Sequence, residues 1–257
     1  MILSLDLARS RIDLRLHAVA PRLAERYRAF AGASGPPRWT LEMRPGPAPG
    51  LGRLTGRAVL RDGLLRIEGA EALGWLDPSA RRGEAFEDPM LVGVDGLVRA
   101  ALATDVLDRG GCLLHAAAVE VEGLAHLAPG RSGAGKSTFA ALAGNPLTDE
   151  LAAVIPTDGT FEVHGTPWWR ARAGAAALGA IYRLAWGGEG VVPLGRAAAL
   201  RHLVANLVLP VDGPGERRRA FTAAAAMAAA APFAQLAFRP VSDVDALLRR
   251  AAAAGTA

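Results

Sequence analysis

The residue types at positions 130–137 are those that proteins use to bind phosphate. The segment reads Gly-Arg-Ser-Gly-Ala-Gly-Lys-Ser and fits the pattern G-x-x-x-x-G-K-[ST], which is called the P-loop. Its glycines let the chain curl so that successive backbone N–H groups point inward, and the following helix adds the positive end of its dipole. Lys136 is the only lysine among 29 lysines and arginines, which indicates that a compact ammonium is needed here. The motif predicts binding of a nucleoside triphosphate.

The whole loop is expected to contact the nucleotide. Its members are Gly130, Arg131, Ser132, Gly133, Ala134, Gly135, Lys136, Ser137 and Thr138. Lys136 can reach the β- and γ-phosphates, and the Ser137 hydroxyl can ligate Mg²⁺. Apolar runs at 119–122 and 123–128 predict strands before the loop, and 137–143 predicts a helix after it, which is the order that the mechanism requires. The alternative is a glycine-rich turn without function, but the only lysine of the chain lands at the required place.

An acidic pair, Asp149 and Glu150, follows in an apolar segment, 147–155, that predicts one strand. In a right-handed crossover this strand lies beside the strand that enters the P-loop, so its carboxylates come near the phosphates. One carboxylate can then bind Mg²⁺, directly or through water, while the other accepts a proton from an attacking hydroxyl. The alternative is a solvated acid at the end of a strand.

His115 is a polar residue inside an apolar strand predicted at 112–119. A single histidine in such a strand is more often a hydrogen-bonded core residue. Its hairpin partner leads straight into the P-loop, so the imidazole can instead face the phosphates. The residues alone leave both interpretations open.

Two other classes of P-loop protein are disfavoured by the sequence. Transport-type ATPases place their acidic strand much further along the chain and carry an LSGGQ-like signature, which this sequence lacks. GTPases read their base with an N-K-x-D motif, which cannot occur here because the only lysine belongs to the P-loop.

A candidate acceptor site follows Thr166-Pro167. Its members are Trp168, Trp169, Arg170 and Arg172. Adjacent residues of an extended chain face opposite sides, so one tryptophan can pack inward while the other meets a ligand. The two arginines stand at alternate positions and can hold a carboxylate or phosphate of the acceptor. The alternative is one buried tryptophan beside a solvated arginine pair.

Composition excludes several kinds of protein. Apolar residues make up 51% of the 257 residues, which is ample for a core, and the net charge is only +4. The arginine clusters at 81–82 and 217–219 are too short to indicate nucleic-acid binding. Cys112 is the only cysteine, so neither an intrachain disulfide nor a thiolate metal cluster can form. We expect a cytoplasmic protein without nucleic-acid or membrane partners, because the start lacks a signal-peptide pattern and the longest alanine-rich stretch, 220–231, is too short to span a bilayer. A homo-oligomer stays open.

The chain is expected to contain two domains. Residues 1–88 predict a small α+β domain on the substrate side, and residues 89–257 predict the P-loop catalytic domain with a helical tail. In the first domain we expect a helix at 21–33, a strand at 39–43 and a hairpin whose strands at 57–61 and 64–68 flank Asp62-Gly63. In the second we expect helices at 88–108, 195–209, 217–231 and 241–254, and a strand at 161–164.

Three segments resemble the HPr kinase/phosphorylase superfamily, especially its divergent HPr-kinase-related serine kinases found near peptide-modification and lasso-peptide genes. They are LLHAAAVEVEG at 113–123, APGRSGAGKST at 128–138 and LTDELAAV at 147–154. Further segments that look like landmarks of the family lie at 164–168, 192–194 and 233–240. The resemblance implies an α/β fold with a mixed sheet, shared with phosphoenolpyruvate carboxykinases, and the use of ATP and Mg²⁺ to phosphorylate a serine hydroxyl.

The resemblance also implies roles for individual residues. Asp149 would be the base, Ser137 and Glu150 would lie on the Mg²⁺ side, and His115 would sit near the phosphates together with Lys136. The bifunctional members carry Asp-Asp where this chain has Asp149-Glu150, and the longer loop motif associated with phosphorolysis is not recognisable. The resemblance therefore does not extend to phosphorylase activity or to HPr as the substrate.

The expected function is an ATP- and Mg²⁺-dependent kinase that acts on a Ser/Thr-type hydroxyl of a peptide, protein or small molecule. Two alternatives stay open. One is a kinase of small molecules only, which would enclose its acceptor, whereas a macromolecular acceptor requires an open groove above Asp149. The other is a non-catalytic, nucleotide-gated scaffold in a peptide-modification system, which sustained ATP turnover with a hydroxyl acceptor would exclude.

Overall fold

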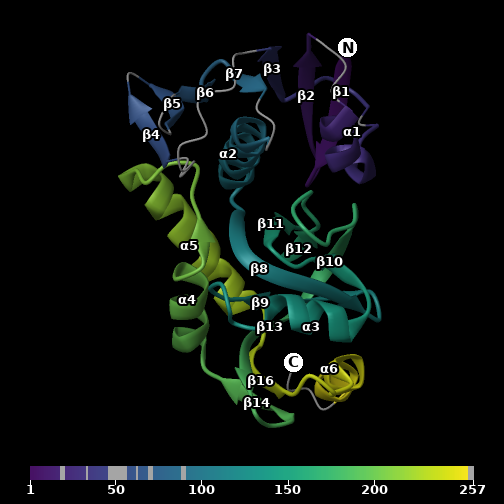
Figure 1. The fold of residues 1–257 in the computed structure, drawn as a ribbon. Helices are drawn as coiled ribbons and strands as arrows, with labels where there is room; N and C mark the ends of the chain where they lie inside the picture. The colour runs from purple at the N-terminus through teal and green to yellow at the C-terminus, as the bar shows by residue number, and fades with distance from the viewer. Residues whose placement is uncertain are drawn as a thin grey trace. The chain divides into compact units, whose positions relative to one another are not determined.

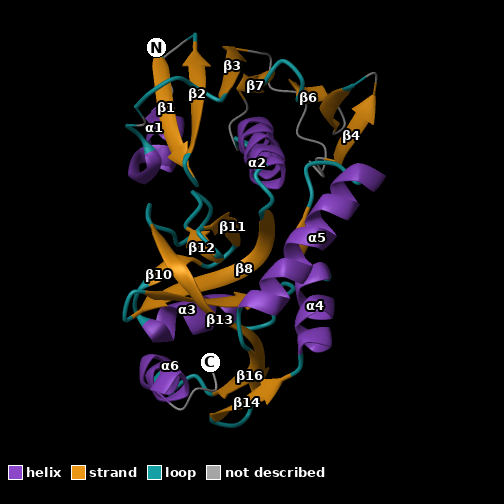
Figure 2. Cartoon of the chain, turned by 180° about the vertical axis from the view of Figure 1, so that it is seen from behind, coloured by secondary structure: helices purple, strands orange, loops and turns teal. Residues whose placement is uncertain are grey.

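The structure is a computed structural model and describes residues 1–17, 21–32, 34–45, 57–61, 63–68, 72–87 and 91–253. Over these ranges the chain is a mixed α/β protein with two mixed sheets and six α-helices (Figure 1 and Figure 2). It divides into two compact units, one of Met1–Asp105 with Leu209–Arg217 and one of Val106–Val208 with Arg218–Ala257. The division falls within a helix, beyond the boundary at 88 expected from the sequence.

The first unit contains a seven-stranded sheet in the order β1-β2-β3-β7-β6-β5-β4. β3 runs parallel to β2 and β7, and the other neighbours are antiparallel. The elements up to the unit boundary are β1 (Ile2–Leu7), β2 (Ser10–Leu16), α1 (Pro21–Tyr27), the 3-10 helix η1 (Arg28–Phe30), β3 (Trp39–Pro45), β4 (Arg57–Arg61), β5 (Leu64–Glu68), β6 (Ala72–Asp77), β7 (Arg82–Glu87) and α2 (Val92–Asp108), which ends in the second unit.

Most local expectations for this part are confirmed. The strand predicted at 39–43 is β3, and the predicted hairpin is β4 and β5 in antiparallel register. Asp62 of its turn, Ala33, and the start of the helix expected at 88–108 lie outside the described residues. The helix expected at 21–33 is shorter than predicted, because α1 ends at Tyr27 and continues only as η1.

A buried carboxylate ties the strands of this unit to α2. Asp105 is fully buried, and its Oδ1 accepts hydrogen bonds from Arg38 Nε at 2.5 Å and Arg81 Nη1 at 3.3 Å, while Oδ2 accepts one from the Ser10 hydroxyl. The Arg81 guanidinium also lies 4.9 Å from the ring centroid of Trp39. Burial of this charge is tolerated because cations and a hydroxyl satisfy it.

The second unit contains a nine-stranded sheet. Its main order is β10-β8-β11-β12-β13-β16-β14, with β9 paired to β8 and β13 and with β15 paired to β8. The elements are β8 (Cys112–Val121), β9 (Leu124–Pro129), α3 (Lys136–Ala143), β10 (Pro146–Thr148), β11 (Leu151–Thr157), β12 (Thr160–His164), β13 (Ala175–Trp186), β14 (Gly190–Leu194), α4 (Arg196–Val204), β15 (Leu207–Val208), α5 (Pro214–Ala230), which begins in the first unit, β16 (Phe233–Phe238) and α6 (Val244–Ala253).

Alternate residues of β8 enter two separate apolar clusters, as the period of a strand requires. Ala116 and Ala118 belong to the cluster that includes α4 and α5, whereas Ala117 and Val119 belong to the cluster that includes α3 and α6. The sheet is therefore covered on both faces, and its strands can be apolar throughout.

The expectation of a helical C-terminal tail is wrong. The three predicted helices occur as α4, α5 and α6, although Ala254 lies outside the described residues, but β13 to β16 alternate with them. β13 and β16 pair in parallel within the sheet. The alanine-rich sequence of β13, AAALGAIYRLAW, lacks the polar alternation of a half-exposed strand because apolar residues also occupy its half-exposed positions.

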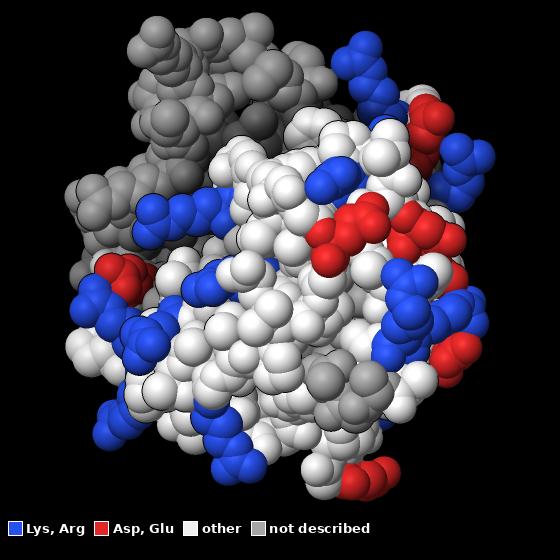
Figure 3. Space-filling view, turned by 90° about the horizontal axis from the view of Figure 1, so that it is seen from below, with Lys and Arg blue, Asp and Glu red and all other residues white. Residues whose placement is uncertain are grey.

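The surface of the described residues carries charges of both signs. On the face seen in Figure 3, basic and acidic side chains lie near one another around a largely uncharged centre. None of the helices in the described ranges is long and apolar enough to cross a membrane.

His126 makes the stability of the second unit depend on pH. Its ring is buried and stacks on Tyr182 with centroids 5.8 Å apart, and burial lowers the pKa of His126 from 6.5 to about 4. The unfolded chain therefore takes up this proton at higher pH than the folded chain. We expect stability that is present above pH 6.5 to fall as the pH drops towards 4, by up to about 3 kcal/mol from this group.

Urea unfolding at a series of pH values checks this expectation. His126→Phe should flatten the loss of stability below pH 6.5, without removing it, because burial also lowers the pKa of His202. His17→Gln, which alters a half-exposed histidine, is the control and should keep the wild-type profile. An unchanged profile in His126→Phe would contradict the assignment.

Candidate functional site

The loop between β9 and α3 is curled in a way that its glycines allow. Gly133 and Gly135 adopt φ values of 82° and 97°, in the left-handed region that favours glycine. At Gly130, a Cβ atom would lie 2.8 Å from the Cβ of Ala134, so a side chain would force the loop open. The Ala134 N–H donates to the Arg131 carbonyl at 3.1 Å and closes the turn.

The loop presents free backbone donors. Within the part of the chain that the structure describes, the N–H groups of residues 131–133 and 135–138 donate to no protein acceptor. Those of Lys136, Ser137 and Thr138 belong to the first turn of α3, where the helix dipole is positive. Such a set of unpaired donors in one loop favours an anion with several oxygens.

Lys136 holds the curled loop from inside. Its side chain is buried, and Nζ donates to the carbonyls of Gly130 at 2.9 Å and Arg131 at 3.2 Å. Burial lowers the pKa of Lys136, while the charges of Glu150 and Asp149 act in the opposite direction. An ammonium has three donors, so one remains for a ligand.

The acidic pair lies between two strands rather than inside one. The expectation of a single strand over 147–155 is wrong, because β10 and β11 are separate and Asp149-Glu150 form the bend between them. The expected neighbour was also wrong: β10 and β11 pair with β8, while β9 pairs with β8 and β13. Since β8 is long, it can take β9 at one end and β11 at the other, and the acidic bend still lies within electrostatic reach of Lys136.

The two carboxylates of the bend have different surroundings. Asp149 is buried, and its Oδ1 accepts the Arg170 backbone N–H at 3.1 Å, which is its only hydrogen bond to the described residues. Glu150 is about one-third exposed, and its Oε1 lies 3.5 Å from Nε2 of His115. Asp149 is thus held in place while its second oxygen makes no hydrogen bond to the described residues, whereas Glu150 is more accessible to solvent.

His115 joins the loop to the acidic bend. Its backbone carbonyl accepts the Gly130 N–H at 3.0 Å, and its N–H donates to the Asn206 carbonyl at 2.9 Å. Next to it, the Ala116 N–H donates to the Glu150 carbonyl at 3.0 Å. The imidazole is partly exposed and faces Glu150, so it is not a fully enclosed core histidine.

A metal ion would need ligands from outside the protein. Among the described residues, no group of three or more His, Cys, Asp or Glu side chains lies close enough to hold one. The Ser137 hydroxyl and the Glu150 carboxylate are hard oxygen donors, which Mg²⁺ prefers, and Mg²⁺ usually completes its shell with phosphate oxygens and water. The residues present therefore fit Mg²⁺ that arrives with a nucleotide.

The two tryptophans of the candidate acceptor segment face opposite environments, as the sequence predicts. Trp168 is 1% exposed and Trp169 is 76% exposed, and Trp169 adopts an unusual φ of 58°. Arg170 is exposed, and its backbone N–H binds Asp149. Arg172 instead pairs with Glu120 and donates its backbone N–H to Leu147 at 3.2 Å, so it anchors the segment rather than pointing freely at an acceptor.

The sequence does not reveal that Glu120 pairs with Arg172, that the Asn206 carbonyl accepts the His115 N–H, or that Trp186 lies beside Gly135. Each of these contacts joins residues far apart in the chain, so no short spacing predicts it. Neither the models of known protein families nor the curated proteins provide a match to the chain.

Lys136→Met should weaken binding of Mg-ATP by about a hundredfold or more, because it removes a buried cation that holds the loop. Lys136→Arg should also fail, since a forked guanidinium does not fit between the two carbonyls. Calorimetry measures the affinity, and circular dichroism checks that the fold survives. Arg131→Ala removes an exposed charge from the same loop and should keep most of the affinity. Wild-type binding by a folded Lys136→Met variant would contradict the role of the loop.

Proposed function

We propose that this protein is an ATP- and Mg²⁺-dependent kinase that transfers the γ-phosphate to a Ser/Thr-type hydroxyl of a peptide, protein or small molecule. One observation carries the proposal: a glycine loop with free N–H groups, a buried lysine and an acidic bend meet in the second unit. The motif resemblance to HPr-kinase-related serine kinases supports the same activity and the same P-loop kinase core.

The proposed chemistry uses the chain's own groups in complementary ways. The free N–H groups and the Lys136 ammonium neutralise the β- and γ-phosphates. The open oxygen of Asp149 accepts the proton of the acceptor hydroxyl as its oxygen forms a bond to the γ-phosphorus. The bond from the γ-phosphorus to the bridging oxygen breaks, which leaves ADP, a phosphate ester and a protonated Asp149.

Ser137 and Glu150 would hold Mg²⁺, and the ion would supply positive charge against the phosphate oxygens. His115 would keep the Glu150 carboxylate in place, since the two side chains lie 3.5 Å apart. The backbone carbonyl of His115 also fixes the start of the loop, because it accepts the Gly130 N–H.

The exposure of the segment at Trp169 and Arg170, which contacts Asp149, favours a peptide or protein as acceptor. Trp169 and Arg170 are exposed next to the Asp149 contact, whereas a metabolite kinase would enclose this region. A bulky residue held at positive φ is strained, and such strain is often found at functional sites. We therefore propose that Trp169 and Arg170 contact the acceptor.

A cytoplasmic location belongs to the same proposal. ATP is the donor, and the single cysteine, Cys112, can form no intrachain disulfide. Cys112 is buried, and burial raises its pKa to about 12, so its thiol is inert.

Asp149→Asn tests the base. The variant should bind Mg-ATP like the wild type but transfer phosphate about 10²–10⁴-fold more slowly, because the amide cannot take the proton. Single-turnover transfer of labelled phosphate to a peptide library with serine and threonine gives the rate. Asp158→Asn alters an exposed acid in the neighbouring β11–β12 turn and should behave as wild type. Transfer at the wild-type rate by Asp149→Asn would move the base elsewhere, and no transfer by the wild type to any hydroxyl would favour a scaffold.

Arg170→Ala and Trp169→Ala test the acceptor contact. Each should raise the acceptor KM about tenfold with unchanged affinity for ATP, because both side chains are exposed beside the Asp149 contact. Arg172→Ala is the contrast: it breaks the pair with Glu120, so it should lower the urea midpoint of the second unit. Unchanged kinetics in both exposed-residue variants would remove this segment from the acceptor site.

A further inference from the structure

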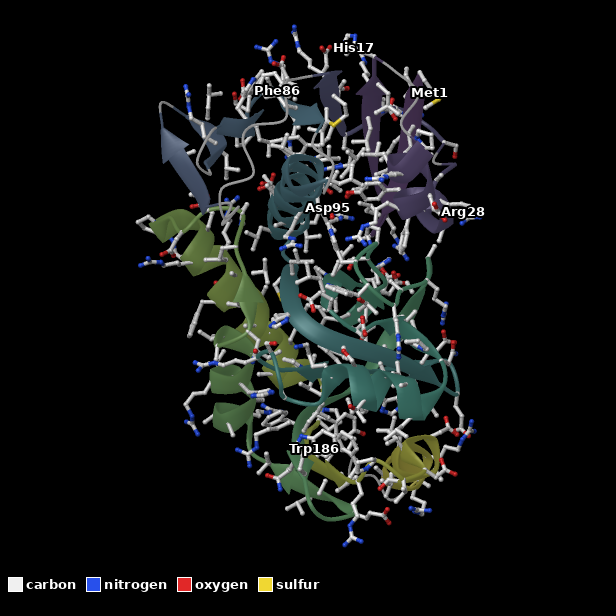
Figure 4. The ribbon with its side chains drawn as sticks, in the orientation of Figure 1. Met1, His17, Arg28, Phe86, Asp95 and Trp186 are labelled. Atoms are coloured by element: carbon white, nitrogen blue, oxygen red, sulfur yellow. The ribbon has the colours of Figure 1, made fainter. Side chains whose placement is uncertain are left out.

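Trp186, the last residue of β13, packs against a buried aromatic side chain. It pairs in register with Phe238 of β16, and the two rings lie 4.9 Å apart at an angle of 41°. Phe238 is fully buried, and its ring lies 6.4 Å from that of Phe139 in α3. Figure 4 labels Trp186 at this end of the unit, near α6. The indole is therefore held by the same apolar cluster that supports the helix of the P-loop.

The indole lies against the P-loop itself. A Cβ atom built on Gly135 would be 3.0 Å from Cζ2, 3.3 Å from Cε2 and 3.4 Å from Nε1 of Trp186. Gly135 directly precedes Lys136, and its φ of 97° together with this contact leaves little room for a side chain. The Trp186 indole thus lies beside the backbone N–H groups that are expected to bind the phosphates.

The Trp186 side chain is 50% exposed to solvent, although it is one of the largest apolar side chains of the second unit. An aromatic ring that is supported from beneath and open above is a surface on which another flat ring can stack. The loop beside it would hold the phosphates, so the base of the same nucleotide is the flat group that can reach it.

We propose that Trp186 is the stacking platform for the purine base of the nucleoside triphosphate bound by the P-loop. This inference rests on the proposed function. Stacking uses the face of a base and not its edges, so it tolerates different bases. Two polar side chains within three residues of Trp186 in the sequence are already engaged elsewhere, since Arg183 donates to Gln235 at 2.6 Å and Glu189 accepts from Ser242 at 2.5 Å. The protein should therefore accept ATP and GTP with similar affinity.

Three ligands separate the base from the phosphates: Mg-ATP, Mg-GTP and Mg-tripolyphosphate, measured by calorimetry on the full chain. Trp186→Ala should bind ATP and GTP about tenfold more weakly or worse and tripolyphosphate as before. Trp186→Phe should recover most of the nucleotide affinity. Phe221→Ala is the matched control, because Phe221 is a 51% exposed aromatic residue on α5 and should leave all three affinities unchanged.

Two results would contradict the stacking role of Trp186 without contradicting phosphate binding by the P-loop. Unchanged ATP affinity in Trp186→Ala would show that the base lies elsewhere. A parallel loss of tripolyphosphate binding would show that the indole only shapes the loop at Gly135. A wild-type protein that binds neither tripolyphosphate nor nucleotide would instead reject the proposed function itself, and the platform with it.

Discussion

The buried ammonium of Lys136 is the interaction on which the candidate site depends. A buried charge is destabilising unless hydrogen bonds and opposite charges compensate it. Here the Gly130 and Arg131 carbonyls turn inward to accept its protons, and the acidic bend supplies negative charge nearby. That inward turn leaves the loop's N–H groups without protein acceptors, so the same interaction that closes the loop also prepares it for an anion.

β8 carries the geometric relation between the parts of the site. Its His115 carbonyl fixes the start of the loop, and the next N–H, on Ala116, fixes the backbone of Glu150. The single peptide group between His115 and Ala116 thus contacts both the glycine loop and the acidic bend, and it sets the distance between them. The aromatic group of Trp186, Phe238 and Phe139 supports the other side of the loop. The loop is therefore held between a rigid strand and an aromatic cluster, which suits a site that must keep its donors in place.

Short sequence patterns predicted the elements that residue type alone specifies. They failed where the pairing of distant strands determines the structure. The pairing of β4 with β5 and the curled glycine loop before α3 could be predicted, because short residue patterns mark both. The turn between β1 and β2 is made by Ala8 and Arg9, both at positive φ, and neither residue type signals such a turn. The alanine-rich β13 lacks the polar alternation that marks a strand, because apolar residues also occupy its half-exposed positions.

The sequence by itself determined which groups are available to the candidate site: the P-loop motif, its single lysine and the acidic pair depend on residue type and short spacing, which need no tertiary information. The tertiary structure decided which groups meet. It separated β10 from β11, opposed Glu150 to His115, engaged Arg172 with Glu120 and brought Trp186 to Gly135. These contacts join residues far apart in the chain through strand register. A one-residue shift of register would turn each side chain to the other face, so these contacts depend on pairing between strands that are distant in the sequence.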